Sequence, residues 1–328
     1  MRAAGPAIGF DGATEPELAL FREDVIAGLA LPQKCIPSKY LYDRVGSRLF
    51  DEITRLPEYY LTRTEEAILN AARDELAELI GPEVELIEFG AGSLRKVRIL
   101  LRAMREPAAF VPIDISRGHL VGAAIELARE FPRLEIRPLV ADFSKPIGGL
   151  AGRSGGRRVA FFPGSSIGNF QPAAAASFLS GVAATVGIGG GLLIGVDPPK
   201  DKDILFAAYN DSRGVTAAFN RNVLVRINRE LGGGFDPRRF RHFAPYNEAE
   251  GRIEMHLVSE GRQDVHLCGR EFRMRDGEKI HTENSYKYSP SAFLALAASV
   301  GFRSARTWVD RQGLFSVHFL RVEPRSEP

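Results

Sequence analysis

Hydrophobic and polar positions alternate in two ways along the middle of this chain. Apolar side chains recur at the three- and four-residue spacing of an amphipathic helix in residues 65–80, 94–104, 118–131 and 173–186. Short, nearly continuous apolar runs lie between them, at residues 84–90, 108–116, 134–143, 158–164 and 190–197. Apolar runs of this length, separated by helices, predict a parallel sheet whose strands are buried on both faces.

Two segments fall outside this alternation. Residues 1–62 precede the first predicted sheet strand, and residues 200–287 interrupt the series. The second segment combines a helical pattern at 219–231 with strand-like alternation, as in residues 252–259. We therefore expect a second, α+β lobe for the substrate, formed by residues 8–62 together with residues 200–287.

The chain closes with a helix and a hairpin. Residues 289–302 have helical spacing, and residues 307–322 form two apolar runs around a turn at Asp310–Gly313. The whole pattern predicts an α/β fold: a mostly parallel, Rossmann-like sheet with an antiparallel C-terminal hairpin and an inserted α+β lobe. The sheet lobe then comprises residues 63–199 and 288–328.

The composition mainly excludes classes of protein and kinds of site. The 328 residues are 45% hydrophobic and 26% charged, as in an ordinary globular protein. Lys and Arg number 43 against 41 Asp and Glu, so there is no basic excess for nucleic-acid binding. The two cysteines, Cys35 and Cys268, cannot build a disulfide framework, which indicates a reducing compartment such as the cytoplasm. Cys268, His256 and His266 lack the close spacing of metal ligands, and we expect no metal. Nothing indicates an oligomer, so we expect a monomer.

One long stretch could be mistaken for a membrane span. Residues 159–196 contain no charged side chain, but Pro163, Pro172 and the run Gly189–Gly191 divide them into strand, helix and strand. We expect buried core elements there and no membrane association. The N-terminus has no long apolar region before Asp11, so we expect no signal peptide.

The carboxyl ends of the first three predicted strands carry the groups of a nucleotide site. Gly90 and Gly92 follow the first strand and permit close approach of a ligand to the backbone. Asp114 ends the second strand, where its carboxylate can accept both ribose hydroxyls. Asp142 and Phe143 end the third strand, where an acid and an aromatic ring can hold an adenine. The plainer alternative is that the two aspartates only cap helices or turns.

This arrangement favours an adenosyl group over a dinucleotide. The third glycine of a dinucleotide-binding turn is missing, and Arg95 and Lys96 stand there instead. A nicotinamide oxidoreductase therefore remains only an alternative.

Residues 197–200, Asp-Pro-Pro-Lys, look like the tetrad of enzymes that methylate nucleobase amino groups. They follow the fifth strand, not the fourth, and have lysine where an aromatic should stack, so we interpret them as a lobe junction. Of the adjacent Tyr59 and Tyr60, we expect one to be a core residue, because neighbours on an extended segment face opposite ways.

Several longer segments carry a more specific signal: residues 42–43, 46–51, 53–60, 62–65, 164–169, 209–211, 216–222 and 280–285. Together they resemble the L-histidine Nα-methyltransferase family of ergothioneine biosynthesis, from about residue 20 to the C-terminus. The resemblance implies a class I methyltransferase fold with S-adenosylmethionine as cofactor. It also implies that histidine is methylated, through its mono- and dimethyl forms, to the betaine hercynine. Because relatives methylate tryptophan-type amines, another amino acid or aromatic amine is an alternative substrate, and a catalytically silent binding protein is a further possibility.

The resemblance also implies residue roles. Asn169 and Tyr209, assisted by Tyr59, match the positions that hold the substrate carboxylate. Tyr42 matches a tyrosine near the amine and is the candidate catalytic proton acceptor. The positions for the imidazole are Glu283, Ser285 and Met255, of which Met255 could equally be plain core. The positions for the cofactor are Glu88, Gly90, Gly92, Lys96, Asp114, Asp142 and Phe143. Departures from the family pattern occur at Leu61, Ala91 and Asn284, the last of which bears on the polarity of the ring pocket.

Overall fold

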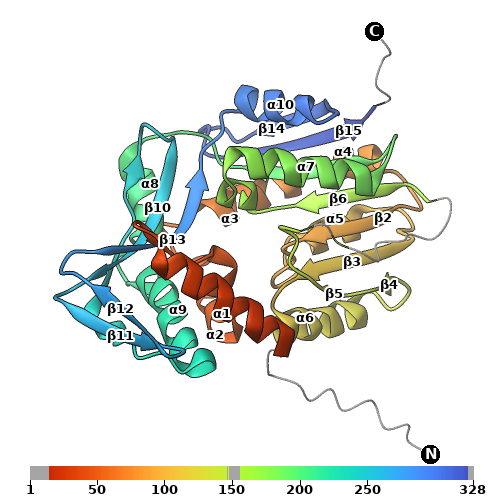
Figure 1. Ribbon diagram of the computed structural model, residues 1–328. Helices are drawn as coiled ribbons and strands as arrows, with labels where there is room; N and C mark the ends of the chain where they lie inside the picture. The colour runs from red at the N-terminus through yellow and green to blue at the C-terminus, as the bar shows by residue number, and fades with distance from the viewer. Residues whose placement is uncertain (1–14, 146, 148–155, 324–328) are drawn as a thin grey trace, which may run out of the picture.

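The computed structural model describes residues 15–145, 147 and 156–323. Its strands form a mostly parallel eight-stranded sheet, a separate five-stranded sheet and a two-stranded hairpin (Figure 1). Residues 8–14 of the predicted substrate lobe, the N-terminal segment for which we expect no signal peptide, and residues 324–328 of the sheet lobe lie outside the described residues.

The eight-stranded sheet confirms the predicted fold class. Its strands are β2 (Glu85–Phe89), β3 (Ala109–Asp114), β4 (Glu135–Ile136), β5 (Leu139–Val140), β6 (Arg158–Phe162), β7 (Gly191–Val196), β14 (Phe302–Val309) and β15 (Ser316–Val322). The order is β14-β15-β7-β6-β2-β3-β4, with β5 also beside β3. Strands β2 to β7 pair in parallel, whereas β15 is antiparallel to both β7 and β14. The strand order reverses beside β2, so a ligand is expected at the carboxyl ends of β2 and its neighbours.

Helices cover both faces of this sheet. They are α3 (Tyr60–Ala71), α4 (Arg73–Ile80), α5 (Val97–Ala103), α6 (Arg117–Glu130), α7 (Pro172–Val186) and α10 (Pro290–Ser299). Along β2, Leu86 packs into one buried cluster, while Ile87 and Phe89 pack into a second cluster with residues of α7 and α10. Burial on both faces explains why the central parallel strands are largely apolar in sequence.

Two predicted elements are broken in the structure. The helix expected over residues 65–80 is two helices, α3 and α4, because Ala72 leaves helical geometry at φ −98° and ψ 5°. The strand expected over residues 134–143 is reduced to the short β4 and β5. Between them Pro138 has no N–H to donate to the neighbouring strand, which interrupts the ladder.

The second sheet joins the N-terminal segment to the insertion. It consists of β1 (Lys34–Cys35), β8 (Phe240–Phe243), β9 (Tyr246–Asn247), β10 (Arg252–Ser259) and β13 (Lys279–Tyr286). The short β1 pairs in parallel with β13. Around it are α1 (Glu15–Ala30), α2 (Arg44–Ile53), α8 (Lys202–Tyr209), α9 (Val215–Leu231), the 3₁₀ turns η1 (Ser38–Leu41) and η3 (Pro237–Arg239), and the hairpin of β11 (Gln263–Leu267) and β12 (Arg270–Met274). The division of the chain into two domains stays a proposal.

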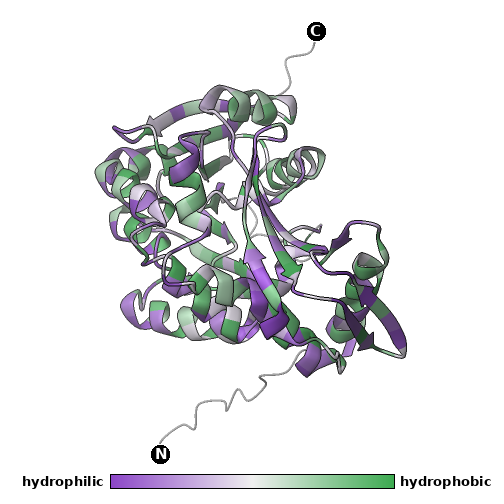
Figure 2. Ribbon diagram, turned by 90° about the vertical axis from the view of Figure 1, so that its left-hand side faces the viewer, coloured by the Kyte–Doolittle hydropathy of each residue, from purple (hydrophilic) through white to green (hydrophobic). Residues whose placement is uncertain are grey.

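The charge-free stretch 159–196 forms core elements. It contains most of β6, the 3₁₀ turn η2 (Ser166–Asn169), α7 and β7, and every residue of β7 is buried. Within the described part of the chain, no helix is long and apolar enough to cross a membrane. Hydrophilic and hydrophobic residues are mixed along the helices that surround the sheets, whereas hydrophobic residues prevail on the sheet strands within (Figure 2).

Candidate active site

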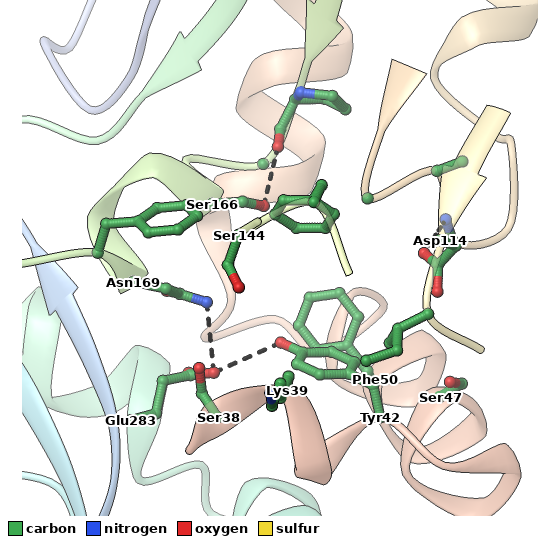
Figure 3. A pocket seen from close by; sticks show the side chains of 18 of the residues that line it. Ser38, Lys39, Tyr42, Ser47, Phe50, Asp114, Ser144, Ser166, Asn169 and Glu283 are labelled. Atoms are coloured by element: carbon green, nitrogen blue, oxygen red, sulfur yellow. Dashed lines mark hydrogen bonds between the residues drawn. The ribbon is translucent and has the colours of Figure 1, made fainter. Parts of the chain in front are cut away.

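A cavity of about 590 Å³ opens at the carboxyl ends of β2 and β3. Its walls come from the N-terminal segment around η1 and α2, from the loops after β2, β3 and β5, from η2, and from β13 (Figure 3). All seven predicted cofactor residues line it: Glu88, Gly90, Gly92, Lys96, Asp114, Asp142 and Phe143. The tertiary structure thus brings three successive strand ends and the N-terminal segment to one place.

Asp114 is held at the end of β3 by backbone N–H groups. Gly92 donates to Oδ2 at 3.0 Å and Ser116 donates to Oδ1 at 2.8 Å. Burial raises the pKa of this carboxyl, although these N–H groups act in the opposite direction. Each carboxylate oxygen has a second lone pair, so the fixed group can still accept two hydroxyl donors from a ligand.

Glu88 is the most deeply buried acid of the cavity, at 1% exposure. Its Oε2 atom has no hydrogen-bond partner among the described residues, and burial raises the pKa of this carboxyl well above its usual value. An unpartnered buried acceptor of this kind fits a ligand that brings its own donor. Lys96, by contrast, is ion-paired with the fully buried Glu65, which also accepts from the N–H of Gly164 at 2.9 Å.

Asp142 and Phe143 form the far end of the cavity. Burial would raise the pKa of Asp142, but hydrogen bonds from Ser144 and the Lys39 ammonium at 3.2 Å outweigh it, so the pKa is lowered. The Phe143 ring lies close to Gly90, where an added Cβ would meet it at 3.4 Å. The positive φ of 67° at Gly90 also favours glycine. An aromatic ring, an ionised acid and an exposed backbone are groups that can hold an adenosyl moiety.

A second, inner cavity of about 40 Å³ continues from the first. It holds the predicted substrate residues Tyr42, Tyr59, Asn169, Tyr209, Met255, Glu283 and Ser285. Four of them, Tyr42, Tyr59, Asn169 and Glu283, line both cavities, so the two spaces share a wall. Asn284 lines only the larger cavity, so its polar side chain is not part of the inner lining. Each predicted site residue therefore lies at one of the two cavities, while the roles remain predictions.

Glu283 is the acid of the inner cavity. Tyr42 donates its hydroxyl to Glu283 Oε2 at 3.5 Å, and the Asn169 amide donates to the same oxygen at 3.4 Å (Figure 3). Burial raises the pKa of Glu283 to about 7, against the lowering effects of the Lys287 charge and of the Tyr42 hydrogen bond. Burial also raises the pKa of Tyr42 well above its usual value, so its phenol keeps its proton at neutral pH.

The register of β10 and β13 explains how Glu283 and Ser285 face the same space. Met255 is paired with Glu283, but the next residue, His256, is paired with His281, so Thr282 is an extra residue. A bulge of this kind re-aims the side chains beside it. Glu283 and Ser285 are two residues apart and therefore lie on one face of the strand.

Sequence reasoning missed several residues of the site. Phe50 and Phe219 line the inner cavity and pack edge-on against Tyr42, with ring centroids 5.6 and 5.3 Å from it. Both lie inside segments that carried the family resemblance, but their periodicity is that of ordinary helical core. Lys287, fully buried behind Ser285, was also missed, because a lysine one residue after a strand gives no sequence signal of burial.

The adjacent tyrosines separate as predicted, but for a different reason. Tyr59 lines both cavities, whereas Tyr60 is buried and donates its hydroxyl to Asp197 at 2.8 Å. Tyr60 is the first residue of α3, so the pair does not lie on an extended segment. Asp197 and Lys200, which we interpreted as a lobe junction, are ion-paired beneath the inner cavity. In the part of the chain that the structure covers, no group of three or more His, Cys, Asp or Glu side chains could hold a metal.

Gly168 allows η2 to pack directly on β13. A Cβ at this position would meet the Tyr286 carbonyl oxygen at 2.7 Å and the Tyr286 nitrogen at 3.1 Å. We expect Gly168→Ala to lower the free energy of unfolding by about 1–3 kcal/mol and to weaken turnover, because Asn169 would shift with the turn. Urea unfolding and kinetics measure both effects.

Gly181 provides the matched control for this substitution. It lies on α7, and an added Cβ would meet nothing within 4 Å. Gly181→Ala should raise stability by about 0.5–1 kcal/mol through helix propensity, with turnover unchanged. Equal effects of the two substitutions would contradict the close packing of η2 on β13.

Comparison with known proteins agrees with this geometry. Residues 21–322 match the sequence profile of a family described as histidine-specific methyltransferase, SAM-dependent. The chain is 43% identical to the histidine N-alpha-methyltransferase of Mycolicibacterium smegmatis over 301 residues, covering 90% of this chain and 93% of that protein. It is 42% identical, with the same coverage, to the protein of that name from Mycobacterium tuberculosis. It is 30% identical to ergothioneine biosynthesis protein 1 of Schizosaccharomyces pombe over 77% of this chain and 34% of that protein.

Proposed function

The chain belongs to the family of histidine-specific, S-adenosylmethionine-dependent methyltransferases, and we propose that it converts L-histidine to hercynine by three methylations of the α-amino group. This is the methylation step of ergothioneine biosynthesis, in keeping with its fungal relatives. The observation that carries the proposal is Glu283, a buried acid in an otherwise uncharged inner cavity that opens toward the adenosyl site. A carboxylate there can accept the ring N–H of histidine.

The residues of the larger cavity fit S-adenosylmethionine. Asp114 would take the ribose hydroxyls, Asp142 and Phe143 the adenine, and the unpartnered Oε2 of Glu88 a donor of the cofactor. Gly90 leaves the backbone open to it. When bound, the cofactor supplies an electrophilic methyl group on a sulfonium, and the chain supplies alignment in a water-poor cavity.

On the substrate side, the chain orients the amine. Asn169, Tyr209 and Tyr59 present neutral donors that suit the substrate carboxylate. The amine must be neutral to attack, and Tyr42, which keeps its own proton, can accept a hydrogen bond from the amine N–H and orient the lone pair. Rings at this end of the cavity also suit the growing positive charge of a methylated ammonium.

Mass spectrometry of amino acids incubated with S-adenosylmethionine tests this function. Histidine should gain three methyl groups, while tryptophan and tyrosine should gain none or far less, because their larger rings satisfy the inner cavity's polar groups less completely. Preferred methylation of an aromatic amine would support the alternative substrate class. Binding of both ligands with no mass gain would point to a silent binding protein and contradict the proposal.

The remaining expectations accompany this function as proposals. Residues 63–199 and 288–328 form the cofactor domain, and residues 8–62 and 200–287 form the substrate domain. A monomer in the cytoplasm without nucleic-acid partners stays a proposal, in which the near-neutral charge argues against nucleic acid and the count of two cysteines argues for a reducing compartment.

A further inference from the structure

A buried ammonium lies directly behind the inner cavity. Lys287 has 0% side-chain exposure, and its Nζ has three acceptors: Asp197 Oδ2 at 2.7 Å, Ser285 Oγ at 2.8 Å and the Tyr209 hydroxyl at 3.1 Å. An ammonium has three N–H donors and no acceptor, so these three contacts use all of them. Ser285 and Tyr209 both line the inner cavity, whereas Lys287 does not.

This contact fixes the direction of the hydrogen bonds. Both hydroxyl oxygens must accept from Lys287, because the ammonium can only donate. The two hydroxyls also lie 2.7 Å apart, with Tyr209 donating to Ser285. In that arrangement the hydroxyl hydrogen of Ser285 remains free to be donated to a ligand in the inner cavity. If Tyr209 instead donates to a ligand, Ser285 donates to Tyr209 across the same 2.7 Å contact, and the Tyr209 hydrogen faces the cavity. In either case the lysine makes this wall a donor surface.

Asp197 holds the lysine in place. Its carboxylate, also fully buried, accepts from the Tyr60 hydroxyl at 2.8 and 2.9 Å and is ion-paired with Lys200 as well as with Lys287. Its backbone N–H donates to Ser165 at 2.9 Å. The ammonium is therefore compensated by a neighbouring charge, and its position is determined from several sides.

We propose that Lys287 is a positioning residue that determines ring specificity: it turns Ser285 and Tyr209 into donors, so that the inner cavity accepts a ring with one lone pair and one N–H. This inference rests on the proposed function. Neutral imidazole offers a nitrogen lone pair to Ser285 and an N–H to Glu283. Indole, pyrrole and phenyl rings have no acceptor nitrogen, and would leave the Ser285 donor buried without a partner.

The test compares histidine with 3-(2-pyrrolyl)alanine and 3-(3-pyrrolyl)alanine, which keep a ring N–H but lack the acceptor nitrogen. For each amino acid, kcat and KM are measured with wild type, Lys287→Met and Lys200→Met. The ratio of kcat/KM for histidine to that for the pyrrolylalanines should fall by about tenfold or more in Lys287→Met, chiefly through the KM for histidine.

Lys200→Met is the matched control. Lys200 binds the same Asp197 carboxylate but contacts Tyr60 and the Pro198 carbonyl in place of Ser285 and Tyr209. Its removal should leave the specificity ratio unchanged, even if it lowers stability. Calorimetric binding of S-adenosylmethionine verifies that each variant is folded. Should Lys287→Met not fold, the double variant Asp197→Asn with Lys287→Met removes the whole ion pair and should show the same fall in ratio.

Two results would overturn the inference. One is an unchanged specificity ratio in a folded Lys287 variant. The other needs no variant: wild-type enzyme that methylates the pyrrolylalanines as efficiently as histidine. A wild type that does not methylate histidine at all would instead refute the proposed function, so the two failures are distinguishable.

Discussion

Replacing Glu283 with alanine is expected to lower kcat/KM for histidine by about 100-fold or more, while the affinity for S-adenosylmethionine stays unchanged. Glu283 is 8% exposed and is the acid of the inner cavity, so without it a buried ring N–H would have no acceptor. Glu283 also borders the larger cavity, but the residues predicted to bind the adenosyl group stand at the ends of β2, β3 and β5. Steady-state kinetics and calorimetry measure the two quantities separately.

Glu283→Gln is the isosteric companion to this variant. Its amide oxygen can still accept, so the loss should be smaller than for alanine. Because the pKa of Glu283 is about 7, wild-type kcat/KM should increase as the pH rises through 7 and the carboxylate becomes ionised. This increase of kcat/KM around pH 7 should be absent in Glu283→Gln, because an amide does not ionise. A full loss of cofactor binding in either variant would show that Glu283 acts on the fold and not on the substrate.

Replacing Asp114 with asparagine is expected to raise the dissociation constant of S-adenosylmethionine by about 100-fold. Asp114 is fixed by the N–H groups of Gly92 and Ser116, which can bind a carboxylate oxygen but not an amide NH₂ group. The substitution therefore turns one end of the side chain away from the backbone and also weakens two hydrogen bonds to ribose hydroxyls. Calorimetry with S-adenosylmethionine measures the change.

Asp51→Asn separates this effect from the general charge of the cavity. Asp51 also lines the larger cavity, but its carboxylate faces His119 at 3.7 Å, and no backbone N–H of the described residues donates to it. Its neutralisation should change the dissociation constant by less than about fivefold, as for a partly exposed charge. Similar losses in the two variants would mean that cofactor binding depends on overall negative charge and not on the geometry of Asp114.

Local pattern was sufficient for most of the sheet. The strands β2, β3, β6 and β7 are largely apolar because helices cover both of their faces, and their apolar runs are visible in the sequence. The local pattern was insufficient where a single backbone position decides whether a helix or strand continues. Ala72 divides one expected helix into two although alanine favours helix, and Pro138 interrupts the strand over residues 134–143. Neither position alters the hydrophobic period on which the predictions depend.

For the candidate site, the sequence by itself determined which chemical groups stand at the strand ends and, through the family resemblance, which residues to examine. Gly90, Asp114 and Asp142 follow strands whose parallel order brings their carboxyl ends together, so their proximity follows from topology. Only the tertiary structure decided what lies behind the substrate residues. Asp197 follows β7, whereas Ser285 and Lys287 lie together at the end of β13, and the hydrogen bonds of Lys287 to both depend on the packing of these two segments against each other. A lysine in a sequence predicts an exposed position, because a buried ammonium is stable only where folding places a carboxylate beside it.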